Sequence, residues 1–107
     1  MWNMYVFVEL KPFAAVRDKY LSDDELAAFQ FYLAEHPDAG DVIPHSGGCR
    51  KVRWAAEGRG RRGGVRVIYF LRLGPEEIVL VTMYAKNVQE NIDPMLLRRL
   101  KEMFEHG

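Results

Sequence analysis

Arginine side chains are concentrated in one glycine-rich stretch of this sequence. The stretch from Arg50 to Arg66 reads RKVRWAAEGRGRRGGVR and holds seven of the fifteen Lys and Arg residues against one acid, Glu57. Its formal charge is therefore +6 (seven minus one), while the rest of the chain carries −6 (eight minus fourteen) and the whole chain is neutral. Because a local field concentrates and orients a polyanion, this asymmetry predicts a partner rich in phosphate.

The same stretch has the chemistry of a phosphate cradle. Arginine presents a planar fork that hydrogen-bonds phosphate oxygens in pairs, and glycine permits positive φ and close approach of a phosphate chain. We interpret the stretch as a hairpin that binds a bent nucleic-acid backbone. A solvated hairpin tip, whose arginines only keep the protein soluble, is the alternative interpretation.

Strand alternation predicts which side chains accompany the cradle. In VRVIYFLR, one face carries Val65, Val67, Tyr69 and Leu71, and the other carries Arg66, Ile68, Phe70 and Arg72. In the following strand, Ile78, Leu80, Thr82, Tyr84 and Lys86 are expected on one face. Tyr84 and Lys86 then emerge side by side at a strand end. A phenol beside an ammonium group, near arginines, is a set that could stack a base and handle protons and phosphate charge.

Two nucleotide-binding motifs and a metal site are excluded by their surroundings. Residues 58–63 satisfy GxGxxG, but the dinucleotide motif requires a helix next, and the β-rich VRVIYFL follows instead. The kinase form GxGxxGxV is excluded because a chain of 107 residues without HRD or DFG cannot be a kinase. His45 and Cys49 form half a metal-ligand set, and His36 and His106 stand at no recognised spacing, so no metal is predicted.

The elements that position these residues follow from local patterns. Strands are expected at residues 4–10, 49–56, 65–73 and 77–85, with a loop at 36–48. Helices are expected from Pro12 through residue 21, from about Ser22 to Glu35 with a Ser22/Glu25 capping box, and from Asp93 and Pro94 onward. In the last helix the side chains able to face the sheet are Leu96, Leu97, Leu100, Met103 and Phe104.

The expected fold is α+β, with the order βααβββα. Its antiparallel sheet consists of a three-strand meander and the N-terminal strand, packed against helices. A length of 107 residues predicts a single domain over residues 1–107. The one cysteine excludes an internal disulfide. With no signal peptide or bilayer-spanning run in the sequence, we expect a cytoplasmic protein without a membrane partner or cofactor.

These residues also carry a family resemblance. The stretch GDVIPHSGGCRKVRWAAEGRGRRGGVRVIYF (residues 40–70), followed by TMYAKN (residues 82–87), resembles toxins of the RelE/ParE superfamily of type II toxin–antitoxin modules. It is most similar to the HigB-type branch, which typically reads GDVI, then GG-x-RK-x-R, then a Gly/Lys-rich KRGG-x-R run before a hydrophobic strand, then Y-x-KN. The resemblance covers most of the chain and implies a RelE-like fold.

The resemblance implies a ribosome-dependent mRNA endoribonuclease. In such a reaction the ribose 2′-hydroxyl attacks the adjacent phosphate without a metal, giving a 2′,3′-cyclic phosphate and a 5′-hydroxyl. The implied phosphate-binding and catalytic residues are Arg59, Arg61, Arg62, Arg66, Tyr84 and Lys86. Tyr84 would stack a base or position the leaving oxygen, and Lys86 would stabilise or protonate developing charge. Arg50, Lys51 and Arg53 form an implied outer strip that binds messenger or ribosomal RNA.

One departure from the family pattern leaves the general base unassigned. Arg59 and Arg61 stand where family members often carry lysine, and arginine cannot act as a base at physiological pH. Tyr84 and His45 are the other side chains considered for this role. Two further functions stay open: a ParE-like inhibitor of DNA gyrase without catalytic activity, and an inactive nucleic-acid-binding module. The resemblance implies mRNA, the ribosome and a cognate antitoxin as partners. The antitoxin is expected to be of helix-turn-helix type, and DNA would be contacted only through the toxin–antitoxin complex.

Overall fold

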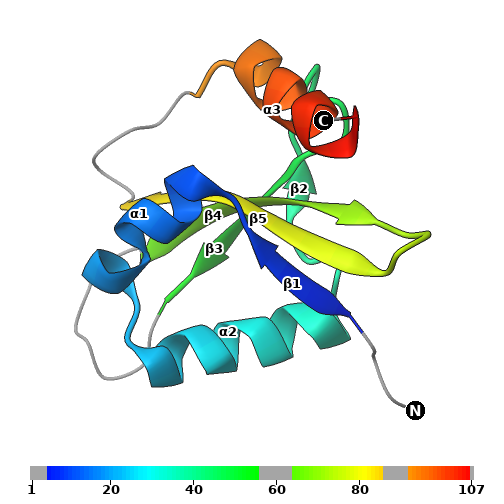
Figure 1. Cartoon of the computed structure of the whole chain (residues 1–107). Coiled ribbons are helices and arrows are strands. Elements are labelled where there is room, and N and C mark those ends of the chain that lie inside the picture. The colour runs from blue at the N-terminus through cyan, green and yellow to red at the C-terminus, as the bar shows by residue number, and fades with distance from the viewer. Residues whose placement is uncertain (1–4, 56–63, 86–91, 107) are drawn as a thin grey trace.

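A five-stranded sheet with helices on both faces forms the protein (Figure 1). The computed structural model describes residues 5–55, 64–85 and 92–106. The strands are β1 (Val6–Glu9), β2 (Asp41–Val42), β3 (Arg50–Trp54), β4 (Val65–Arg72) and β5 (Glu77–Ala85). The helices are α1 (Lys11–Tyr20), α2 (Asp23–Glu35) and α3 (Pro94–His106). The α+β class expected from the sequence is confirmed.

The sheet is mixed, with the strand order β1-β5-β4-β3-β2. The predicted antiparallel meander of β3, β4 and β5 is present. In contrast to the antiparallel pairing expected for the N-terminal strand, β1 lies parallel to β5. The reason is that the two helices between β1 and β3 form a crossover, so that β1, β3 and β5 all run in one direction. The two-residue strand β2 lies within the segment predicted as a loop and pairs with the edge of β3.

Both helix starts that the sequence predicts from capping residues are confirmed. At α2, Ser22 Oγ accepts a hydrogen bond from the Glu25 backbone N–H (3.1 Å), and the Glu25 carboxylate accepts one from the Ser22 N–H (2.8 Å). At α3, the Asp93 carboxylate accepts a hydrogen bond from the Met95 N–H (3.0 Å). These side chains satisfy backbone donors that the first helical turn leaves without partners, which fixes where each helix begins.

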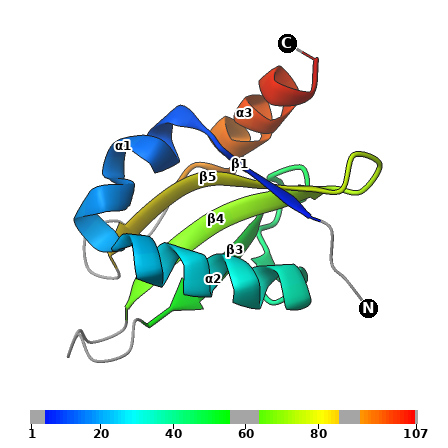
Figure 2. The ribbon, with the colours of Figure 1, turned by 60° about the horizontal axis from the view of Figure 1, so that its bottom comes forward.

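Two hydrophobic cores hold the layers together, one on each face of the sheet. Figure 2 shows α2 and α3 on opposite sides of the sheet. The first lies under α1 and α2 and includes Phe13, Phe29, Leu33, Val67 and Tyr69. The second lies under α3 and includes Cys49, Ile68, Phe70, Val79, Val81, Tyr84 and Leu97. The predicted alternation of β4 is therefore confirmed, since its odd-numbered apolar residues face the first core and Ile68 and Phe70 face the second.

The apolar stripe of α3 is narrower than the sequence predicts. Leu97 is buried, and Leu100 and Phe104 pack against the core beneath the helix. Leu96 and Met103 are 50% and 61% exposed, so the prediction that they face the sheet is wrong. The spacing i, i+3, i+7 of the buried residues defines a single helical face, and residues 96 and 103 each lie one position, about 100°, away from it. The outward side of α3 therefore carries apolar side chains.

Candidate nucleic-acid interface

Three residues predicted for the site form a row across the face of the sheet that α3 partly covers. In the strand register, Arg53 of β3 is the partner of Arg66 of β4, and Arg66 is the partner of Tyr84 of β5. Directly opposed residues of antiparallel strands project from the same face. Tyr84 belongs to the core under α3, which identifies that face. Arg53 is exposed and Arg66 is half-buried, so cationic side chains on two adjacent strands lie beside a buried tyrosine.

A β-bulge interrupts β5 before this row. Ile68 pairs with Thr82, whereas the next residue of β4, Tyr69, pairs with Leu80. Val81 is therefore an extra residue on β5 with no partner of its own on β4. A bulge of this kind breaks the strict alternation of side chains, so residues after it lie on the opposite face from the one that simple counting gives.

The bulge corrects the predicted neighbours of Tyr84. Ile78 and Leu80 belong to the core under α1 and α2, whereas Tyr84 belongs to the core under α3. The prediction that these three residues share a face is wrong, because it treats the alternation of β5 as uninterrupted. The result favours a functional site, since it makes Tyr84 the direct neighbour of Arg66 across the ladder. Bulges commonly re-aim side chains in this way beside active sites.

The predicted RNA-binding strip of β3 divides between the two faces of the sheet. Lys51 is the partner of Ile68 and is exposed on the α3 face, one position along the face from the arginine row. Arg50 points to the other face, where its Nη1 donates hydrogen bonds to the carbonyl oxygens of Gly40 (2.7 Å) and Asp38 (3.3 Å). Arg50 therefore ties the segment that precedes β2 to the sheet.

A cavity of about 190 Å³ opens beside the row. Its lining residues come from the β2–β3 turn, the sheet and the start of α3: Ile43, Lys51, Ile68, Tyr84, Ile92, Pro94 and Leu97. Tyr84 is only 6% exposed, so the predicted stacking of its ring on a base could take place only through this cavity. Because Lys51 is exposed, the cavity reaches the protein surface.

Most residues of the cavity wall could not be predicted from the sequence. Ile43 falls in a segment predicted as a loop, Ile92 precedes the last helix, and Leu97 is predicted only to face the sheet. No short-range spacing connects these three positions, since they meet only through the packing of α3 against the sheet. The available signal is the adjacent apolar pair Val42 and Ile43 in a loop rich in Gly, Pro and Asp, and it does not tell which of the two side chains has a partner elsewhere in the fold.

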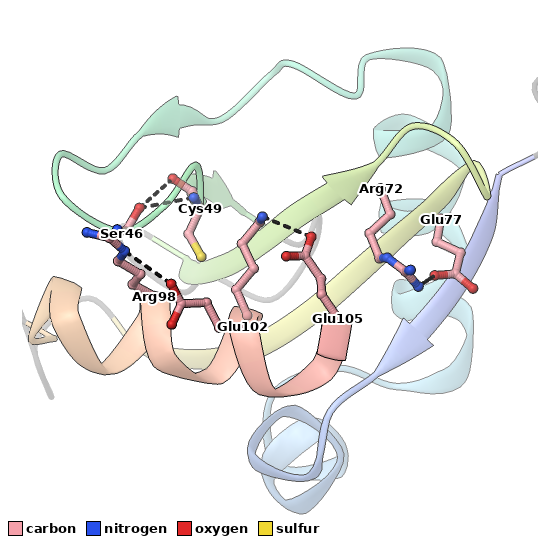
Figure 3. Close-up of polar contacts among 8 residues, drawn as sticks. Ser46, Cys49, Arg72, Glu77, Arg98, Glu102 and Glu105 are labelled. Carbon is pink, nitrogen blue, oxygen red and sulfur yellow. Dashed lines mark hydrogen bonds and ion pairs between the residues drawn. The ribbon is translucent and has the colours of Figure 1, made fainter. Parts of the chain in front are cut away.

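Two cation–π contacts hold α3 over this face of the sheet, and Figure 3 shows the ion pair of Arg72 with Glu77 that orients one of the two cations. The guanidinium of Arg72 lies 5.2 Å from the ring centroid of Phe104 and its Nη1 lies 2.8 Å from Glu77 Oε1. Lys101 Nζ lies 5.4 Å from the ring centroid of Phe70. The two cation–π contacts join the C-terminal half of α3 to β4. The first turn of the same helix lines the cavity with Pro94 and Leu97.

A serine-centred turn places Ile43 at the cavity. Ser46 Oγ donates a hydrogen bond to the Ile43 carbonyl oxygen (2.6 Å). It also accepts one from the Cys49 N–H (3.0 Å), and Figure 3 shows this second contact. Cys49 is completely buried, and this burial raises the pKa of its thiol, so it remains protonated at neutral pH. His45 is exposed, with a left-handed φ of 66°. In the described ranges, no group of three or more His, Cys, Asp or Glu side chains could hold a metal ion.

Several predicted site residues lie outside the described residues, and their roles stay predictions. These residues are Arg59, Arg61, Arg62 and Lys86. The last glycine of the cationic stretch, Gly64, is described and has a left-handed φ of 62°. A Cβ atom at this position would overlap the carbonyl oxygen of Trp54. The position therefore requires glycine, both for its backbone conformation and for the close approach of β3.

The fold and the row together define a small α+β domain with a cationic site on one face of its sheet. A family model described as the RelE toxin of the RelE / RelB toxin-antitoxin system matches residues 4–106. Since the match spans nearly the entire chain, the protein belongs to the RelE toxin family and is the toxin of a toxin–antitoxin pair, with an antitoxin as its partner. The resemblance to the RelE/ParE superfamily is thus confirmed, and the HigB-type branch stays a prediction. Among the helices in the described ranges, none has the length and apolar character needed to cross a membrane.

Proposed function

We propose that this toxin is a ribosome-dependent mRNA endoribonuclease of the HigB type. The observation that carries the proposal is the row of Arg53, Arg66 and Tyr84 across three adjacent strands, which brings together cations separated in the sequence. An extended RNA backbone could lie along such a row with its phosphates on the guanidinium groups. Family membership supports the same reading, because RelE toxins are generally endoribonucleases.

The proposed reaction breaks the P–O5′ bond of the RNA chain. The 2′-hydroxyl attacks the adjacent phosphorus, its proton goes to a base, and the departing 5′-oxygen receives a proton, which gives a 2′,3′-cyclic phosphate and a 5′-hydroxyl. Arg66, half-buried and thus partly shielded from water, stabilises the extra negative charge of the phosphorane. Arg53 and Lys51, both exposed, bind flanking phosphates.

The remaining roles are assigned by family resemblance. Arg59, Arg61 and Arg62 bind the scissile and neighbouring phosphates, and Lys86 protonates the leaving oxygen. The general base is not one of these arginines, because a guanidinium does not lose its proton at physiological pH. Cys49 is also unsuited to the role, since it is buried and its thiol stays protonated. Groups of the ribosome could complete proton transfer, which would account for the dependence on the ribosome.

The experiment that tests the proposal is 5′-end mapping of transcripts after brief induction of the toxin without its antitoxin. We expect cuts confined to translated regions and carrying 5′-hydroxyl ends. Arg66→Ala should lower the cleavage rate by about 100- to 1,000-fold, as loss of one charge-stabilising group typically does. Arg99→Ala, an exposed arginine of α3, is the matched control and should cut like the parent.

Two results would redirect the assignment. Replication arrest with intact transcripts would indicate a gyrase inhibitor, and growth arrest by Arg66→Ala equal to that of the parent would show that the row is not catalytic. The antitoxin is expected to carry a helix-turn-helix domain, so DNA would be contacted only by the toxin–antitoxin complex. Copurification of the two proteins and an operator-binding assay would check this point.

A further inference from the structure

We propose that the cavity beside the arginine row is a binding site for a single nucleobase, the one attached to the nucleotide whose phosphate lies on that row. This inference rests on the proposed function and adds to it a base-selecting subsite. The volume of the cavity is the first argument. About 190 Å³ is room for roughly six water molecules at ~30 Å³ each. Pockets that enclose drug-sized ligands are larger, at about 300–1,000 Å³, so this one suits one ring system and little more.

The chemistry of the wall is the second argument. Of the lining side chains, only Lys51 and Tyr84 carry polar atoms, and the others present methyl and methylene groups. The five apolar side chains give an inserted planar ring a surface to pack against, and the polar atoms of the lining are left for the edge of that ring. The two faces of a nucleobase are apolar and aromatic, and single-stranded RNA presents them freely. A lysine at the rim can donate hydrogen bonds to the polar edge of the base.

The position of the cavity relative to the row is the third argument. Lys51 and Ile68 line the cavity, and each is two residues along its strand from a member of the row, Arg53 and Arg66. Two residues of a strand span about 6.6–6.8 Å, which is a distance that one nucleotide covers from its phosphate to its base. Tyr84 is shared, as it lines the cavity and pairs with Arg66. The phosphate of one nucleotide can therefore lie on the row while the base of the same nucleotide occupies the cavity.

Binding of short single-stranded RNA to the full-length protein tests the proposal. The probes are a trinucleotide with all three bases and two analogues, each lacking one base, at the central or at the 3′ position. Base stacking in such sites is worth about 5- to 150-fold in affinity. One of the two analogues should therefore bind the parent protein weaker by about that factor, whereas Ile43→Phe, which fills the cavity, should bind all three probes equally. Val42→Phe, at an exposed neighbouring position of β2, is the matched control.

The outcomes separate this inference from the proposed function. Equal affinity of the parent for all three probes, with retained salt-dependent binding, would overturn the base site and leave the phosphate row standing. No binding of any probe would overturn both. If Ile43→Phe still bound one base-lacking analogue more weakly than the complete trinucleotide, the base would bind outside the cavity and the inference would be overturned. If Ile43→Phe does not fold, as judged by thermal unfolding, Ile43→Ala replaces it: the enlarged cavity should then reduce the penalty for the missing base by at least about threefold.

Discussion

Replacing Arg53 and Arg50 separately by glutamine should separate two roles that lie three positions apart in the sequence. Arg53 is exposed on the face that carries the proposed RNA site and is the strand partner of Arg66. Arg50 is on the other face and donates hydrogen bonds to two backbone carbonyl oxygens, those of Asp38 and Gly40. Arg53→Gln should therefore weaken RNA binding with little change in stability, whereas Arg50→Gln should do the reverse.

The magnitude of each effect follows from the number of charges on the site. Each phosphate neutralised on a single strand adds about 0.7 to the slope of log affinity against log salt. The described cations of the site, Lys51, Arg53 and Arg66, thus contribute a slope of about −2.1, or roughly an 18-fold loss of affinity over a fourfold rise in salt. Arg53→Gln should reduce this contribution to about −1.4, or roughly sevenfold. Cationic residues outside the described ranges would add equally to both slopes.

The assay is fluorescence anisotropy with a labelled single-stranded RNA between about 50 and 200 mM salt, paired with urea denaturation. Arg50→Gln should keep the parent slope and lower the free energy of unfolding by about 1.5 kcal/mol, the low end for a charged hydrogen bond, because Arg50 is half-exposed. Arg99→Gln on α3 is the control and should leave both quantities unchanged. If the slope of log affinity against log salt were as shallow for Arg50→Gln as for Arg53→Gln, the conclusion that Arg50 and Arg53 have different roles would be refuted.

Three other predictions concern the support of the site. Tyr69→Phe should lower the free energy of unfolding by about 2–4 kcal/mol in urea denaturation, because its buried hydroxyl donates to a backbone carbonyl oxygen (2.8 Å) and accepts from Gly40 N–H (2.9 Å). Burial raises the folded-state pKa of Tyr69 above its unfolded value of about 10. Above that pH the unfolded chain releases a proton that the folded chain retains, so the parent should lose stability there, and Tyr69→Phe should lack this part of the loss. Gly64→Ala should lower the melting temperature by an amount equivalent to more than about 2 kcal/mol, and equal stability of Gly64→Ala and the control Gly74→Ala, at an open position, would contradict the close approach at Gly64.

Local chemistry explains what could be predicted from the sequence. The starts of α2 and α3 depend on side chains one to three residues away, Ser22 with Glu25 and Asp93 with Pro94, and a short window contains all of them. The faces of β4 depend on alternation alone, and they are as predicted. The parallel pairing of β1 with β5 depends instead on the path of two helices across the sheet, and no local pattern encodes that path.

The site required longer-range information. Arg50, Lys51 and Arg53 look alike as a run of basic residues, and their division between two faces depends on which strand and which loop each one meets. Arg50 donates hydrogen bonds to carbonyl oxygens of the segment before β2, and this contact exists only in the folded chain. The phosphate-rich partner that this cluster of charge suggests therefore stays a prediction, and the choice of which basic residues could face RNA needs the strand register.

The bulge at Val81 gives Tyr84 a role that differs from the one implied by a free aromatic side chain at a strand end. Tyr84 packs under α3 with Leu97 and is 6% exposed, so its ring could not turn outward without opening a close-packed core. It can act only as a fixed wall between the cavity and Arg66. Because Tyr84 borders both the cavity and Arg66, a base bound in the cavity would fix the position of its phosphate against Arg66. Selection of the base and stabilisation of the phosphorane would then depend on the same side chain, which is how a site this small could combine sequence preference with cleavage.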